Sequence, residues 1–286
     1  MKKILLSILL VLFFCTQSLA ESSVWKVQKG ESIIYLGGTF HLLRQSDFPL
    51  PIEFDKAYRD SDILVFETDI GKFTDPSTQQ KLLSEAVYSD GSTIDMHLSP
   101  QTYSLLNEYF ASNGIPIAAF KQFKPSIIVV TITVMELAKL GVTQEGVDLF
   151  FYKLAAGDNK SMEAFETVEE QISFVVGMGD GDEDAFVTHS IKDLVSIKQK
   201  FESMADAWKR GNAKKLNDLM VAELKTKTPK LYKELITDRN VNWLPMIEAY
   251  QKTLQKEFIL VGVGHLVGPD GIVEALRQKG YKVGKL

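Results

Sequence analysis

The sequence has only one cysteine in 286 residues, Cys15, which lies in an N-terminal segment that we expect to be cleaved. The mature chain then has no thiol for a disulfide, a thiolate metal site or a cysteine nucleophile. The Gly-x-Ser-x-Gly motif of serine hydrolases and the His-Glu-x-x-His motif of zinc peptidases are absent as well. A hydrophobic core alone must hold this protein together, and residues 21–286 are enough to form one.

The sequence also lacks an excess of positive charge. It has 32 Lys and Arg against 37 Asp and Glu, a formal net charge of −5. Removal of residues 1–20 takes away two lysines and no acidic residue, so the charge becomes −7. This balance argues against nucleic acid or an anionic membrane as a partner.

No hydrophobic run is long enough for a comfortable membrane span. The run from Ile4 to Cys15 is shorter than the about 20 apolar residues that a span needs. It follows Lys2 and Lys3 and precedes "TQSLA", which is the pattern of a signal peptide. We therefore expect a signal peptide at residues 1–20, export to the periplasm and no membrane span after cleavage. The sequence leaves the oligomeric state open.

Two similar segments, one near each end, predict the fold class. Apolar and polar residues alternate over residues 24–36, with a turn at "KGES", which predicts a hairpin that leads to Gly37. A helical pattern at 52–60 and the buried strand "DILVF" follow. Near the C-terminus come "EFILVGVGH", the helix "GIVEALRQKG" and "YKVGKL". We expect two βαβ-type units that form one central sheet in a single α/β domain over 21–286.

Most of the chain between these units is predicted to be helical. The expected helices cover residues 102–112, 125–140, 147–156, 169–178, 184–210 and 213–224. A short strand is expected at "SMEAFE", and the charged segment "KTKTPKLYKE" is expected to be solvated surface.

Each terminal unit carries Gly-x-x-His where its first strand ends. His41 follows "GGTF" and His265 follows "GVG", while Glu67 comes directly after "DILVF". Ligands collect at the carboxyl ends of strands in open α/β sheets. If the two units lie side by side, His41, Glu67 and His265 converge on one pocket. Gly38 and Gly262 would then let a substrate or ion approach the backbone.

Two imidazoles and one carboxylate are a ligand set of catalytic divalent metal sites, with a position left for water. Zinc, manganese, cobalt and iron all suit such ligands. Without a metal, a histidine paired with Glu67 is a candidate general base. Simpler interpretations stay open: Glu67 as the cap of the next helix, and Asp69 as a structural or supporting residue. His97 and His189 lie in polar surroundings and are not expected to belong to the site.

Motifs along nearly the whole mature chain resemble the TraB/GumN family, which also includes the PrgY pheromone-shutdown proteins and the animal Tiki proteases. The resemblance rests on "GGTFH", "FETD", "GVDLFFYKLAAGDNKSMEAFETVEEQ", "RN" at residues 239–240, and "VGVGH". It implies an α/β fold of the erythromycin-esterase/ChaN type and, by analogy with Tiki, a peptide hydrolase that uses a divalent metal such as Mn, Co or Zn.

Carried over by position, the resemblance makes His41, Glu67 and His265 metal-binding and catalytic. It adds Arg239, either to hold a substrate carboxylate or an oxyanion, or to form a salt bridge. Glu166 and Gln171 also match, and are expected to organise the fold rather than touch substrate. A peptide or protein is the expected substrate. Two rival functions remain: a protein that binds a peptide or glycan without cleaving it, and a metal-independent, esterase-like hydrolase.

Overall fold

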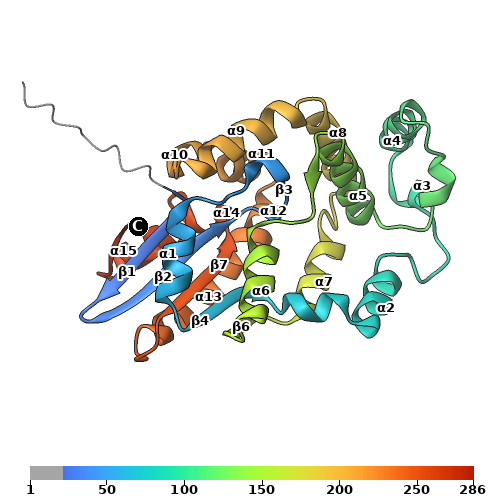
Figure 1. Cartoon of the computed structure of the whole chain (residues 1–286). Coiled ribbons are helices and arrows are strands. Elements are labelled where there is room, and N and C mark those ends of the chain that lie inside the picture. Colours follow the sequence, from blue (N-terminus) through green and yellow to red (C-terminus); the bar gives the residue numbers. More distant parts are fainter. Residues whose placement is uncertain (1–21) are drawn as a thin grey trace, which may run out of the picture.

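A computed structural model describes residues 22–286, and the expected signal peptide lies outside this range. Its centre is a six-stranded sheet with the order β6-β4-β7-β2-β1-β8 (Figure 1). The strands are β1 (Val24–Lys29), β2 (Ser32–Thr39), β4 (Ile63–Thr68), β6 (Ser161–Glu166), β7 (Glu257–Gly262) and β8 (Lys282–Lys285). The mixed α/β class expected from the sequence is confirmed.

The first and last segments of the chain are interleaved in this sheet. Strand β7 lies between β2 and β4 and is parallel to both, with Gly38 opposite Val261 and Phe66 opposite Leu260. The expected hairpin of β1 and β2 forms, and β8 pairs antiparallel with β1. Because β2, β4, β6 and β7 run in the same direction, their carboxyl ends meet at one edge of the sheet.

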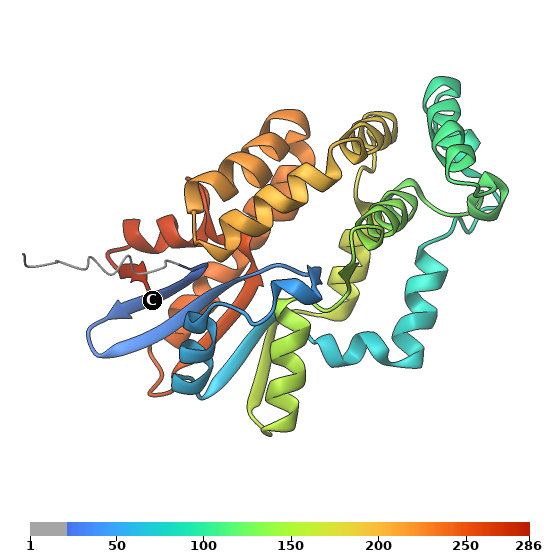
Figure 2. The ribbon, with the colours of Figure 1, turned by 45° about the horizontal axis from the view of Figure 1, so that its top comes forward.

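Helices cover the sheet and extend beyond its carboxyl edge (Figures 1 and 2). The expected helices at 52–60, 102–112, 125–140, 147–156 and 169–178 are present within a few residues. The full set is α1 (Ile52–Asp60), α2 (Pro76–Glu85), α3 (Ile94–His97), α4 (Pro100–Ser112), α5 (Pro125–Ala138), α6 (Val147–Gly157), α7 (Val168–Gly177), α8 (Glu183–Leu194), α9 (Ile197–Lys209), α10 (Ala213–Leu216), α11 (Ala222–Lys227), α12 (Pro229–Tyr232), α13 (Asp238–Tyr250), α14 (Val263–Leu266) and α15 (Ile272–Gln278).

Short elements complete the chain. Strands β3 (Leu43–Arg44) and β5 (Val142–Thr143) form a separate two-stranded sheet. Single helical turns and π-helical stretches occur at η1 (Gln45–Asp47), η2 (Ile70–Thr74), η3 (Ile117–Phe120), η4 (Asn217–Val221) and η5 (Lys233–Thr237). No helix among residues 22–286 is long and apolar enough to cross a membrane.

The single helix expected at 184–210 is wrong, because the structure breaks it at Val195 and Ser196 into α8 and α9. The two halves pack into different hydrophobic clusters. Phe186 of α8 belongs to a cluster with helices α4 and α5, whereas Trp208 of α9 belongs to the main core against the sheet. A straight helix would not bury both faces, and no glycine or proline marks the break in the sequence.

The charged segment 225–234 is also not simply solvated surface. It forms the end of α11, then α12 and the start of η5, and Tyr232 is buried with its hydroxyl donating to Asp270 (2.6 Å). The sequence prediction named no helix over α13, which begins four residues later. This helix carries Arg239 and brings it to the carboxyl edge of the sheet.

Gly38 and Gly284 provide a test of how tightly the sheet packs against the turn after β7. A Cβ on Gly38 would lie 2.7 Å from Val263 Cγ2, whereas a Cβ on Gly284 would meet nothing within 4 Å. We expect Gly38→Ala to lower the free energy of unfolding by about 1–3 kcal/mol, because overpacking a filled core forces its neighbours to move. Gly284→Ala should stay within about 0.5 kcal/mol of the wild type. Urea unfolding measures both, and equal stabilities of the two variants would contradict the packing described.

Candidate functional site

The polar residues of the candidate site lie at the carboxyl edge of the sheet. His41 follows β2, Glu67 lies in β4, Glu166 is the last residue of β6, and His265 lies in α14 directly after β7. Each of the four parallel strands therefore delivers one titratable side chain to the same edge. This arrangement follows from the parallel direction of the strands and the insertion of β7 between β2 and β4.

Three of these side chains converge beside Gly262. A Cβ on Gly262 would lie 3.2 Å from Glu67 Oε1 and 3.6 Å from both His41 Nε2 and His265 Cδ2. The structure thus brings together His41, Glu67 and His265, as the sequence predicted. Gly262 leaves this point uncovered, and its amide donates to Glu67 Oε1 (2.6 Å). Gly38 has a different reason to be glycine, because its missing side chain makes room for Val263.

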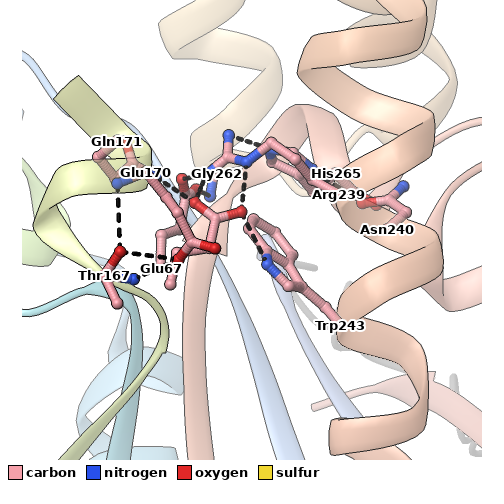
Figure 3. Close-up of polar contacts among 10 residues, drawn as sticks. Glu67, Thr167, Glu170, Gln171, Arg239, Asn240, Trp243, Gly262 and His265 are labelled. Atoms are coloured by element: carbon pink, nitrogen blue, oxygen red, sulfur yellow. Dashed lines mark hydrogen bonds and ion pairs between the residues drawn. The ribbon is translucent and has the colours of Figure 1, made fainter. Parts of the chain in front are cut away.

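Arg239 from α13 joins the buried residues of the site (Figure 3). Its Nε donates to Glu166 Oε1 (2.7 Å), and its Nη2 donates to Glu67 Oε2 (2.7 Å) and Glu166 Oε2 (2.8 Å). Its Nη1 lies 3.2 Å from His265 Nε2. These contacts use four of the five N–H groups of the guanidinium. Arg239 is buried, and the two carboxylates raise its pKa against the effect of burial.

Asn240, next to Arg239 in the chain, determines which nitrogen of His265 carries the proton. The Asn240 amide nitrogen donates to the carbonyl oxygens of His265 (3.2 Å) and Asp270 (3.0 Å). Its oxygen therefore faces His265 Nδ1 (2.8 Å) and accepts a hydrogen bond from the Nδ1–H. His265 Nε2 is left as an acceptor for Arg239. Burial lowers the pKa of His265 to about 3, so this imidazole is neutral.

His41 has the opposite electrostatic environment. Its Nδ1 lies 3.1 Å from Asp148 Oδ2, and 58% of its side chain is exposed. The Asp148 carboxylate raises the pKa of His41 to about 9. Asp148 is in the first turn of α6, whose backbone is pressed against the His41 segment: Val147 N donates to Phe40 O (3.0 Å), and a Cβ on Gly146 would lie 2.2 Å from the His41 carbonyl oxygen.

Glu67 is an ionised carboxylate in this environment. Burial by itself would raise its pKa, but the charge of Arg239, with further contributions from both histidines and the Gly262 amide, lowers it to about 2. Glu166 accepts two more hydrogen bonds, from Gln171 Nε2 (2.6 Å) and Trp243 Nε1 (3.0 Å). The expectation that Glu166 and Gln171 organise the fold agrees with these contacts.

The donors suit a divalent metal in their chemistry. His41 holds its Nδ1 against Asp148 and His265 holds its Nδ1 against Asn240, the supporting contacts that metal-binding histidines make. His41 Nε2 and the His265 ring both lie beside Gly262, as does Glu67 Oε1. No three His, Cys, Asp or Glu residues of the described chain already surround one point as a metal cluster would. Arg239 contacts His265 Nε2, so the guanidinium has to turn away before that nitrogen binds an ion.

The sequence prediction missed Asp148 and Trp243, and it gave Asn240 no role. Asp148 lies within the stretch "GVDLFF" that carries the family resemblance, and an acidic residue in the first turn of a helix is usually read as a favourable contact with the helix dipole. Asp69 proves structural: its Oδ1 accepts from the amides of Gly71 (3.1 Å) and Lys72 (3.4 Å). His97 stacks on Tyr88, and His189 bonds within its own helix; neither reaches the site.

The fold and the site together define an α/β protein with two Gly-x-x-His segments and a buried arginine at the carboxyl edge of one sheet. The chain belongs to the TraB/PrgY/gumN family, whose family model matches residues 23–285. Neither the curated proteins nor the solved structures gave a match to the chain.

The pKa values of Glu67 and His265 predict a loss of stability in acid. Both lie below their ordinary values of 4.5 and 6.5, so the unfolded chain binds more protons than the folded one. The free energy of unfolding should fall as the pH drops from 6.5 toward 3 because of His265, and from 4.5 toward 2 because of Glu67. The contribution is on the order of 3 kcal/mol for Glu67 and on the order of 5 kcal/mol for His265.

Urea unfolding between pH 7 and 3 measures this loss. Glu67→Gln should flatten the curve below pH 4.5 relative to the wild type, while the surface variant Glu274→Gln should keep the wild-type slope. A wild-type stability that does not change between pH 6.5 and 3 would contradict the neutral His265.

The contact between His41 and Asp148 predicts the titration of His41 in metal-free protein. NMR of the imidazole should give a pKa of about 9 in the wild type, and a value at least about one unit lower in Asp148→Asn, where the charge that favours the imidazolium is gone. Glu145→Gln removes a charge three residues away without touching this contact and should leave the His41 pKa within a few tenths of the wild type. An unchanged value in Asp148→Asn would show that Asp148 does not control His41.

Proposed function

We propose that this chain is an exported hydrolase that cleaves peptide bonds at the carboxyl edge of its sheet, with a fold of the erythromycin-esterase/ChaN type. The observation that carries the proposal is the convergence of His41 Nε2, Glu67 Oε1 and the His265 ring beside the bare backbone of Gly262. Two imidazoles with opposite protonation preferences and one ionised carboxylate near the same backbone position are groups suited to acid–base hydrolysis. The N-terminal pattern at residues 1–20 supports export.

A divalent ion, Mn, Co or Zn, is part of the proposal, with His41, Glu67 and His265 as its ligands. Such an ion, when bound, makes hydroxide available near neutral pH by lowering the pKa of its water. Three carboxylates, Glu67, Glu166 and Asp148, lie around the site against the single permanent charge of Arg239. This excess of negative charge favours a further cation there, whether a proton on His41 or a metal ion.

The other residues of the site position the two histidines and leave room for the substrate. Asp148 keeps the Nδ1–H of His41 in place, so that its Nε2 points at the reacting centre; Asn240 does the same for His265. Gly262 leaves room for the bond to be cleaved. Arg239 commits three of its N–H groups to Glu67 and Glu166, so we assign it to positioning these two carboxylates and not to binding a substrate carboxylate.

Substitution of His41 tests the proposal. A library of quenched fluorescent peptides serves as the probe because the natural substrate is unknown. We expect His41→Ala to lower hydrolysis by at least about a hundredfold, the usual contribution of a positioned acid–base group. The matched control is His189→Ala, which removes an exposed imidazole from α8 and should stay within about twofold of the wild type.

The same proteins distinguish the alternatives. The metal content of the wild type should exceed that of His41→Ala, and chelation should abolish hydrolysis until Mn, Co or Zn is returned. Hydrolysis that survives complete chelation would identify the metal-independent, esterase-like hydrolase instead. A wild type that binds library peptides but cleaves none would identify the binding protein and overturn the proposed hydrolase.

A further inference from the structure

A cavity of about 790 Å³ opens directly beside the candidate site. Its floor includes Glu166, Arg239 and Trp243, the residues that join the buried part of the site. One wall is α7, and the other is formed by residues of η5 and α13. Figure 3 shows α7 and α13 on opposite sides of the site. A side chain of a peptide bound at Gly262 could therefore extend into this cavity.

The cavity is strongly acidic. Six carboxylates line it, Glu166, Glu169, Glu170, Asp180, Glu234 and Asp238, against two cations, Lys230 and Arg239. Within the protein, Glu166 is neutralised by Arg239, Asp238 pairs with Lys233, and Glu234 lies 3.9 Å from Lys230.

Three carboxylates on the cavity wall remain without an ion pair among residues 22–286. Glu169 and Glu170 lie on the first turn of α7, where Glu170 also caps the helix through Thr167. Asp180 also lines the cavity and lies three residues beyond the end of α7. All three are exposed. Lys230 lines the same cavity, and its Nζ donates to the backbone carbonyl of Asp180 and not to its carboxylate. With six carboxylates against two cations, the lining keeps an excess of negative charge.

The remaining lining suits the stem of a long side chain. Phe165 and Trp243 stack at the floor with ring centroids 5.3 Å apart, and Phe174 and Met246 lie on the walls. Lysine and arginine combine an apolar stem with a cationic end, and they pack their stems on apolar surface while the charge stays near acidic groups and water. Arg239 already lies over the rings of Phe174 (5.2 Å) and Trp243 (4.5 Å), so the attraction for a substrate cation is assigned to the carboxylates and not to these aromatic faces.

We infer that this cavity is a subsite for a basic side chain, so that the substrates are peptides with lysine or arginine next to the bond that is cleaved. The inference rests on the proposed function for the position of that bond. Peptides with an acidic side chain at the same position are disfavoured by the carboxylates of the wall.

Binding tests the subsite separately from hydrolysis. Three labelled peptides that differ at one position, with lysine, norleucine or glutamate, are titrated by fluorescence anisotropy against His41→Ala protein, in which turnover is blocked. We expect the lysine peptide to bind at least about fivefold more tightly than the norleucine peptide, the effect of two or three solvent-screened charge contacts, and the glutamate peptide to bind most weakly. The lysine preference should shrink as salt rises from about 0.1 M to about 1 M, since the Debye length falls from about 10 Å to about 3 Å.

Two double variants, both made in the His41→Ala protein, test whether the carboxylates of the cavity cause the lysine preference. Glu169→Gln with Asp180→Asn should remove most of the lysine preference, whereas Glu274→Gln with Asp206→Asn, which makes the same change in net charge outside the cavity, should keep it. Equal affinity for the three peptides, or equal loss in both double variants, would overturn the subsite. A lysine preference in binding without cleavage of any peptide by the wild type would overturn the proposed hydrolase and leave the basic subsite standing.

Discussion

The buried guanidinium of Arg239 is the interaction on which the site depends. It connects Glu67 of β4, Glu166 of β6 and His265 after β7, three segments that are separated by about a hundred residues each in the chain. Bringing these charges out of water is costly, and the cost is offset because every oxygen of the two carboxylates accepts a hydrogen bond, from Arg239, Gly262, Trp243 or Gln171. Each of these residues is thereby held in one orientation.

The interleaved sheet is the second constraint. Strand β7 separates β2 from β4, so the site does not exist until the last part of the chain has inserted between two strands of the first. The hydrophobic core also joins early and late segments of the chain. Phe54 of α1 contacts the rings of Phe258 in β7 and Trp208 in α9, and the Trp208 indole donates to the Gly38 carbonyl (2.7 Å). Packing and site geometry are therefore determined together.

The sequence predicted those parts that local pattern controls. The strand, glycine and histidine order located His41 and His265, and the buried strand "DILVF" located Glu67, because strand ends are visible in hydrophobic patterning. It did not reveal that Arg239 pairs with residues 73 and 172 positions away, since any acidic residue is a possible partner for an arginine. The break between α8 and α9 was equally hidden, because it reflects which hydrophobic cluster each half contacts and no feature of its own residues.

The two histidines show how distant residues assign different chemistry to one local motif. Both occupy Gly-x-x-His after a parallel strand, yet Asp148 favours the charged form of His41 while burial beside Arg239 keeps His265 neutral. A proton, or a metal ion in its place, is thus attracted to the exposed His41, and the Nε2 of the buried His265 can only accept a hydrogen bond or donate a lone pair, because its Nδ1–H is bonded to Asn240. The asymmetry comes from α6 and α13, neither of which is part of the repeated motif, so the repeat specifies where the imidazoles lie and the helices specify what each can do.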